Sequence, residues 1–179
     1  KKIYYTDQDI KTQVHEIIRA MLKDSWRPDY IVGLTRGGLV PANMISQYLD
    51  IPMHTLRVSL RDSDSAPESN LWMSEDAFGY DSKAWSANTS YDQFKARNIL
   101  IVDDINDSGA TLDWIRKDWQ SSCLPEHDRW KSVWNQNVKF AVLVNNEASE
   151  FKNIDYVGHY INKHNDDAWI VFPWEQWWK

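Results

Sequence analysis

Residues 99–112, ILIVDDINDSGATL, impose the strongest constraint on the fold of this chain. Four apolar residues run directly into two adjacent aspartates, and a third aspartate opens the segment Asp-Ser-Gly-Ala-Thr. A short apolar run that ends in a polar, glycine-containing segment is typical of a buried strand, and ATLDWIRKDWQ has its apolar residues at helical spacing. The sequence therefore predicts a strand, a loop of small polar residues and a helix, in that order.

The same alternation of strands and helices runs along the rest of the chain. Thr6 and Asp9 resemble a capping box, and the apolar spacing that follows predicts a helix ending near Asp24. Further strands are predicted in RPDYIVGL, IPMHTLRVSL, VKFAVLV and DYVGHYI, and a helix in LVPANMISQYL. This alternation predicts an α/β fold with a mostly parallel central sheet flanked by helices. Ligands of such sheets bind beyond the carboxyl ends of the strands, where TRGG and DDINDSGAT fall.

Length, charge and composition narrow the class of protein. The 179 residues suit one domain, and a hydrophobic fraction of 42% is enough to form a core. The net charge of −6 argues against a nucleic acid as partner. The sequence contains no run of about 18 apolar residues, so no membrane span is predicted. The one cysteine, Cys123, fits a reducing compartment, so we expect a cytoplasmic protein. Most of the eleven tryptophans are expected to be packing residues.

Three interpretations compete for residues 103–111. A calcium loop starting at Asp104 would need an acidic ligand at its twelfth position, where Ile115 stands, and it would follow a helix instead of a strand. A structural turn with Asp107 or Ser108 as helix cap leaves the adjacent aspartates at the strand end unexplained. The third interpretation is a site for a sugar phosphate, and the residue types favour it.

These residue types suit both halves of a ribose 5-phosphate. Backbone N–H groups at the start of a helix bind anions, Gly109 allows a ligand to approach closely, and Ser108 and Thr111 add hydroxyl donors. Asp103 and Asp104 would repel a bare phosphate, but they suit ribose hydroxyls with Mg²⁺ nearby. We therefore expect the phosphate at the helix N-terminus and the ribose diol beside the two aspartates.

The segment ILIVDDINDSGAT resembles the phosphoribosyl pyrophosphate signature of type I phosphoribosyltransferases. In that family the acid pair contacts the ribose hydroxyls, which implies this role for Asp103 and Asp104. The next loop binds the 5′-phosphate, and here it comprises Asp107, Ser108, Gly109, Ala110 and Thr111. Ala110 stands where a lysine or arginine is common in the family. In the 6-oxopurine branch the first aspartate of this loop is the proposed general base for a purine ring nitrogen, a role that the resemblance gives to Asp107.

The segment VGLTRGGLVPA has two interpretations. It can be a glycine-rich turn between a strand and a helix, with Arg36 merely solvated. Alternatively, Gly37 and Gly38 expose backbone N–H groups while Arg36 supplies a fork for phosphate oxygens. The segment resembles the pyrophosphate loop of the same family. The resemblance implies that Thr35, Arg36, Gly37 and Gly38 contact the substrate and that the Thr35–Arg36 peptide bond is cis.

The segment DDAWIVFPWE resembles the purine-binding strand and loop of bacterial xanthine-guanine and hypoxanthine-guanine phosphoribosyltransferases. The resemblance implies that Trp169 stacks on the base and that Ile170 offers backbone contacts; the alternative for Trp169 is core packing. It also places Glu175 near a metal ion and the pyrophosphate. The family usually has a lysine that reads the 6-oxo group, and Asn145, a donor without charge, stands at that position. The sequence therefore leaves the preferred base open.

The resemblance extends over most of the chain and implies a single phosphoribosyltransferase domain, residues 1–179. A small C-terminal hood is expected at about 146–179. A flexible lid is expected at about 61–92, where the sequence is acidic, rich in serine and weakly periodic. Family members are commonly dimers or tetramers, so the resemblance also implies a homo-oligomer.

Together these features predict an enzyme that transfers a phosphoribosyl group from 5-phosphoribosyl 1-pyrophosphate to a purine base of the hypoxanthine, guanine and xanthine class, for nucleotide salvage. Mg²⁺ is the expected cofactor, bound by Asp103, Asp104 and Glu175. Arg36 and Asp107 are the expected catalytic residues. One alternative is a non-catalytic sensor of phosphoribosyl pyrophosphate or nucleotides on the same fold, and another is an enzyme that uses a pyrimidine or another amine. The retained Asp107 favours an enzyme, and the aromatic tail favours a purine.

Overall fold

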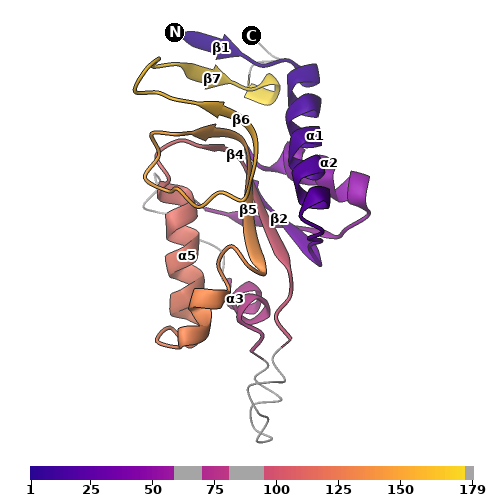
Figure 1. The fold of residues 1–179 in the computed structure, drawn as a ribbon, viewed down its shortest axis with the longest axis vertical. Helices are drawn as coiled ribbons and strands as arrows, with labels where there is room; N and C mark the ends of the chain where they lie inside the picture. Colours follow the sequence, from indigo (N-terminus) through magenta and orange to yellow (C-terminus); the bar gives the residue numbers. More distant parts are fainter. Residues whose placement is uncertain (59–69, 81–94, 176–179) are drawn as a thin grey trace, which may run out of the picture.

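The structure is a computed structural model that describes residues 1–58, 70–80 and 95–175. Five parallel strands form the central sheet in the order β3-β2-β4-β5-β6 (Figure 1). The strands are β2 (Tyr30–Thr35), β3 (Met53–Arg57), β4 (Ile99–Asn106), β5 (Val138–Asn146) and β6 (Tyr156–Ile161). The predicted α/β fold with a mostly parallel central sheet is therefore confirmed.

Helices cover both faces of this sheet because successive residues of a strand point to opposite faces. The helices are α1 (Asp7–Lys23), α2 (Leu39–Leu49), α3 (Leu71–Phe78) and α5 (Ala110–Ser122). Along β4, Ile99 and Ile101 are buried in the core that contains side chains of α3 and α5. Leu100 and Val102 are buried in the core that contains side chains of α1 and α2. Figure 1 shows α1 and α2 across the sheet from α5.

Helix α1 begins where the capping box predicts. The Thr6 side chain accepts a hydrogen bond from the Asp9 backbone N–H at 3.1 Å, and the Asp9 carboxylate accepts one from the Thr6 N–H at 2.7 Å. The helix ends with Asp24 as its C-cap, as its apolar spacing predicts. Its buried face consists of Ile10, Gln13, Val14, Ile17, Ile18 and Met21.

Within the predicted lid, the structure places a helix, α3, over Leu71–Phe78. Met73, Ala77 and Phe78 of this helix are buried in the core, in the same cluster as the apolar face of α5. Their spacing puts them on one face of a helix, but acidic and serine-rich neighbours hide this short apolar face in the sequence. The flanking parts of the predicted lid, 61–69 and 81–92, lie outside the described residues.

A second, two-stranded sheet lies at the top of the molecule in Figure 1. It pairs β1 (Lys2–Tyr4) in parallel with β7 (Trp169–Val171). The sequence predicts a hood from residues 146–179 alone, whereas this sheet takes one strand from the N-terminus, and β6 belongs to the central sheet. The element β1 has only three residues, too few for a periodic signal in the sequence.

Burial accounts for several other expectations. Trp119, Trp130 and Trp134 belong to the core on the α5 side, so they are packing residues as expected for most tryptophans. Cys123 is a buried free thiol. Within residues 1–58, 70–80 and 95–175, no helix has the length and apolar character that crossing a membrane requires.

Candidate active site

Strand β4 carries the acid pair within the sheet, because the strand continues past Val102 to Asn106. Asp103 Oδ1 accepts a hydrogen bond from the Asp104 N–H at 2.9 Å. Asp104 Oδ1 accepts one from the Ile105 N–H at 2.8 Å. These bonds hold both carboxylates at the carboxyl end of the central strand, which is the expected ligand edge of a parallel sheet.

A cavity of about 570 Å³ opens at this edge, a volume typical of sites for small molecules and cofactors. It brings together segments that are far apart in the sequence: the end of β2, the end of β4, the start of α5, the β6–β7 connection and the C-terminal segment. The predicted site residues that line it are Thr35, Asp103, Asp104, Asp107, Ser108, Gly109, Ala110, Thr111, Trp169, Ile170 and Glu175.

The acid pair lies in surroundings that disfavour negative charge. Burial raises the pKa of Asp103 well above its ordinary range, and the charge of Asp104 raises it further. Burial also raises the pKa of Asp104, and hydrogen bonds from its neighbours only partly offset this, while the charge of Glu175 adds to it. No basic side chain of the described residues forms an ion pair with Asp103 or Asp104. This part of the cavity therefore attracts a cation.

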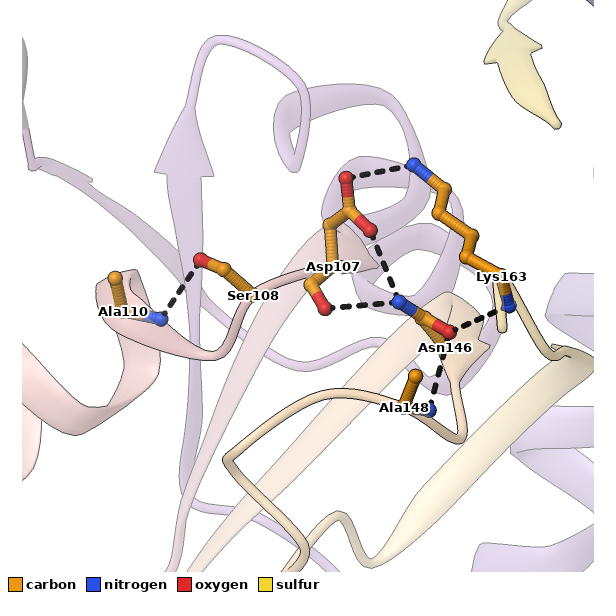
Figure 2. A network of polar contacts seen from close by, with 6 residues as sticks. All are labelled: Asp107, Ser108, Ala110, Asn146, Ala148 and Lys163. Atoms are coloured by element: carbon orange, nitrogen blue, oxygen red, sulfur yellow. Dashed lines mark hydrogen bonds and ion pairs between the residues drawn. The ribbon is translucent and has the colours of Figure 1, made fainter. Parts of the chain in front are cut away.

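The loop after β4 brings the N-terminus of α5 to the cavity. Gly109 has a φ of 91°, in the left-handed region that favours glycine. A Cβ atom at this position would lie 2.6 Å from the Phe151 backbone nitrogen, so no larger residue fits without a shift. The cap residue Gly109 has no side chain to bond the first turn, although the Ala110 N–H donates to Ser108 Oγ at 3.3 Å (Figure 2). Ala110, Thr111 and Leu112 of the first turn line the cavity. Because first-turn N–H groups lack partners within a helix, this end of the cavity suits an anion.

The loop after β2 lies against the acid pair. The Thr35–Arg36 peptide bond is cis, as the resemblance implies. A Cβ atom on Gly37 would overlap the Asp104 carboxylate, and one on Gly38 would overlap a backbone oxygen of β4. Both glycines therefore permit a close approach that other residues would prevent. Thr35 lines the cavity, whereas Arg36, Gly37 and Gly38 are not among its lining residues, and Arg36 is exposed.

The C-terminal segment adds an aromatic ring and a further carboxylate. Trp169 lines the cavity and is 63% exposed, which excludes core packing for this tryptophan. Ile170, the next residue of β7, also lines the cavity. Glu175 accepts a hydrogen bond from the Phe172 N–H at 2.8 Å, which fixes its carboxylate at the end of a short 3₁₀ helix.

Asn145 is not among the residues that line the cavity. Its side-chain oxygen accepts a hydrogen bond from Asn106 Nδ2 at 2.8 Å, and Asn106 also donates to the Phe151 carbonyl at 3.0 Å. Asn145 therefore links β5 to β4, and the cavity geometry gives no support to the base contact that the resemblance implies for it.

Two residues that the sequence analysis does not predict complete the site. Lys163, between β6 and β7, lines the cavity with its Nζ 2.7 Å from Asp107 Oδ2. Asn146 Nδ2 donates to the Asp107 carbonyl at 3.1 Å and to Asp107 Oδ1 at 3.2 Å (Figure 2). Lys163 is 56 positions from Asp107 in the chain and lies in a polar connection, so no local pattern in the sequence indicates their contact.

Known proteins resemble this chain in sequence over nearly its whole length. Residues 2–177 match the family model described as phosphoribosyl transferase domain. The chain is 31% identical over 175 residues to the xanthine-guanine phosphoribosyltransferase of Cereibacter sphaeroides, which covers 91% of this chain and 83% of that protein. It is 24% identical over 196 residues to the hypoxanthine-guanine phosphoribosyltransferase of Schizosaccharomyces pombe, covering 97% of this chain and 89% of that protein.

The fold is also similar to a solved structure, the purine phosphoribosyltransferase of Pyrococcus horikoshii. The TM-score is 0.63 at 24% identity, with 98% of this chain and 95% of that chain covered. This likeness concerns the fold, whereas the family follows from the sequence matches. The chain therefore belongs to the family of phosphoribosyl transferase domains.

Proposed function

We propose that this protein transfers the phosphoribosyl group of 5-phosphoribosyl 1-pyrophosphate to a purine base, as an enzyme of nucleotide salvage. The products are a nucleoside 5′-monophosphate and pyrophosphate. Relatives named as xanthine-guanine and hypoxanthine-guanine phosphoribosyltransferases support this substrate class. The observation that carries the proposal is one cavity that joins the Asp103–Asp104 pair, the N-terminus of α5 and the exposed ring of Trp169.

The sugar phosphate binds between the acid pair and α5. Its 5′-phosphate accepts hydrogen bonds from the first-turn N–H groups of α5 and from the hydroxyls of Ser108 and Thr111. The ribose hydroxyls donate to the carboxylates of Asp103 and Asp104. Neutral donors thus bind the phosphate at the start of α5, and, of the sugar phosphate, the carboxylates of Asp103 and Asp104 contact only the ribose.

The base stacks on Trp169 through dispersion and π contacts. As the bond between purine N9 and ribose C1′ forms, the bond from C1′ to pyrophosphate breaks, and the proton on purine N7 passes to the Asp107 carboxylate. Arg36 and the backbone of residues 35–38 hold the leaving pyrophosphate. Because the transition state resembles a sugar cation, positioning and electrostatics supply most of the catalysis.

The donor chemistry of the site fits Mg²⁺. Asp103 and Asp104 offer carboxylate oxygens without a cationic partner in the described parts of the chain, and Glu175 lies at the same cavity. No cluster of three or more ligating side chains occurs among the described residues, so water and oxygens of the substrate would complete the coordination. When bound, Mg²⁺ neutralises charge on the pyrophosphate.

The direct test is a panel of bases. The protein is incubated with Mg²⁺, phosphoribosyl pyrophosphate and, separately, hypoxanthine, guanine, xanthine, adenine and orotate, and pyrophosphate release is measured. The proposal expects release with at least one 6-oxopurine. Binding of phosphoribosyl pyrophosphate without release for any base would indicate the non-catalytic sensor, and release with orotate alone would overturn the purine assignment.

Asp107 is the residue whose chemical role this reaction tests most sharply. Asp107→Asn should lower kcat by about 10²–10⁴-fold, because the amide cannot accept the purine proton. The affinity for phosphoribosyl pyrophosphate, measured by calorimetry, should change little. Asp128→Asn is the matched control, since the Asp128 side chain is 91% exposed and lies outside the cavity. Nearly unchanged turnover in Asp107→Asn would show that another group takes the proton.

A further inference from the structure

Among the described residues that line the cavity, several side chains are acidic and one is basic. Its acidic lining residues are Asp103, Asp104, Asp107 and Glu175. Among the described residues that line it, only Lys163 is basic. The Lys163 side chain is 20% exposed and its Nζ lies 2.7 Å from Asp107 Oδ2. This ammonium group therefore lies inside the substrate cavity, beside the carboxylate assigned to the base proton.

We propose that Lys163 selects the base by donating a hydrogen bond to the 6-oxo group of a purine. The inference rests on the proposed function and names the substrate group that this side chain recognises. The family resemblance implies that the residue at position 145 contacts the 6-oxo group, but the Asn145 side chain is bonded to Asn106 instead. The inference gives this contact to Lys163, in the β6–β7 connection.

A buried amide fixes Lys163 and Asp107 relative to each other. Asn146, which is 5% exposed, accepts a hydrogen bond from the Lys163 backbone N–H at 3.1 Å and donates to Asp107 Oδ1 at 3.2 Å. Its oxygen also accepts from the Ala148 N–H at 3.1 Å, so both ends of the amide are occupied (Figure 2). The Asp107 carboxylate and the Lys163 backbone are therefore held by the same buried residue.

The chemistry of the purine edge matches this pair. In a 6-oxopurine, O6 and N7 are neighbours on one edge, whereas adenine has an amino donor in place of O6. When the Asp107 carboxylate accepts the N7 proton, the adjacent Lys163 ammonium meets the atom at position 6. O6 accepts a hydrogen bond from it, and the charge makes that bond strong. The amino group of adenine would instead face another donor, which leaves both unpaired and disfavours adenine.

The test compares two purines that differ at position 6, where hypoxanthine has an oxo group and unsubstituted purine a hydrogen; hypoxanthine also has a proton on N1. Steady-state kinetics of the whole protein with Mg²⁺ and phosphoribosyl pyrophosphate are measured for hypoxanthine, and unsubstituted purine is measured as its competitor. Lys163→Met should lower kcat/KM for hypoxanthine by about 10- to 100-fold, the worth of one charged hydrogen bond, and leave the inhibition constant of purine nearly unchanged. Lys163→Gln, which keeps a neutral donor, should lose less.

Lys152→Met is the matched control, because Lys152 is exposed, donates to the Glu147 carbonyl and does not line the cavity. Melting temperature and affinity for phosphoribosyl pyrophosphate report whether the variants are folded. An equal loss for hypoxanthine and purine would mean that Lys163 only positions Asp107 and would overturn the inference. If the wild type is active and the Lys163 variants are as active as the wild type, the inference about Lys163 is overturned and the proposed function stands. If the wild type is inactive with every purine, the proposed function is overturned as well.

Discussion

The carboxylates of Asp103 and Asp104 lie where few groups of the folded chain stabilise a negative charge. Burial raises the pKa of both side chains, and neither has a cationic partner among the described residues. A carboxyl whose pKa is raised by folding lowers the free energy of unfolding at pH values above its ordinary pKa. The acid pair therefore costs stability at neutral pH, and we expect a bound cation with substrate to offset that cost.

This cost predicts that removing one charge stabilises the empty protein and removes its activity. Asp103→Asn should raise the free energy of unfolding at pH 7 by about 0.5–2 kcal/mol, while phosphoribosyl transfer is lost. The asparagine oxygen can still accept the hydrogen bond from the Asp104 N–H, so the local backbone is preserved. Denaturant unfolding without Mg²⁺ measures the effect, with exposed Asp128→Asn as the control. A lower free energy of unfolding in Asp103→Asn would contradict the account of this site.

The unit of β4, its loop and α5 is the part of the fold that local sequence predicts best. A continuous apolar run, a glycine with positive φ at position 109 and helical spacing from Ala110 all lie within about two dozen residues. The extension of β4 through Asp103 to Asn106 is not predictable in this way. It depends on pairing with β5, for example Asn106 beside Asn145, and so on residues far along the chain.

Helix α3 shows the opposite case, since its stability depends on contacts made by distant residues. The Phe78 ring is fully buried and makes an edge contact with His127 at 5.1 Å and a tilted contact with Trp130 at 5.4 Å between ring centroids. None of these partners lies near α3 in the sequence. A prediction from local sequence therefore depends mainly on the acidic and serine-rich residues that flank α3. The helix therefore belongs to the core.

A core role for α3 has a direct consequence for stability. Phe78→Ala should lower the free energy of unfolding by about 3–5 kcal/mol, because it removes a fully buried ring. Leu71→Ala is the matched control on the same helix, where Leu71 is 46% exposed, and it should cost less than about 1 kcal/mol. Both values come from denaturant unfolding followed by tryptophan fluorescence. A Phe78→Ala variant as stable as Leu71→Ala would mean that α3 does not hold the core together.

At the scale of the whole molecule, the site exists because the fold joins segments that no local pattern connects. The motifs around Arg36, Asp107 and Trp169 can be found in the sequence, since each resembles a motif of the family. The pairing of β1 with β7 and the contact of Lys163 with Asp107 cannot, since they depend on how the chain closes. Self-association as a dimer or tetramer stays a prediction from the family resemblance, and light scattering in solution decides it.

The most direct measurement of the central claim is a crystal structure of the protein with guanosine 5′-monophosphate, the expected type of product. The phosphate should lie at the first turn of α5, the ribose hydroxyls beside Asp103 and Asp104, and the base on the ring of Trp169. In the same crystal, Lys163 should lie next to O6 of the base. A nucleotide bound elsewhere, with this cavity empty, would contradict the account.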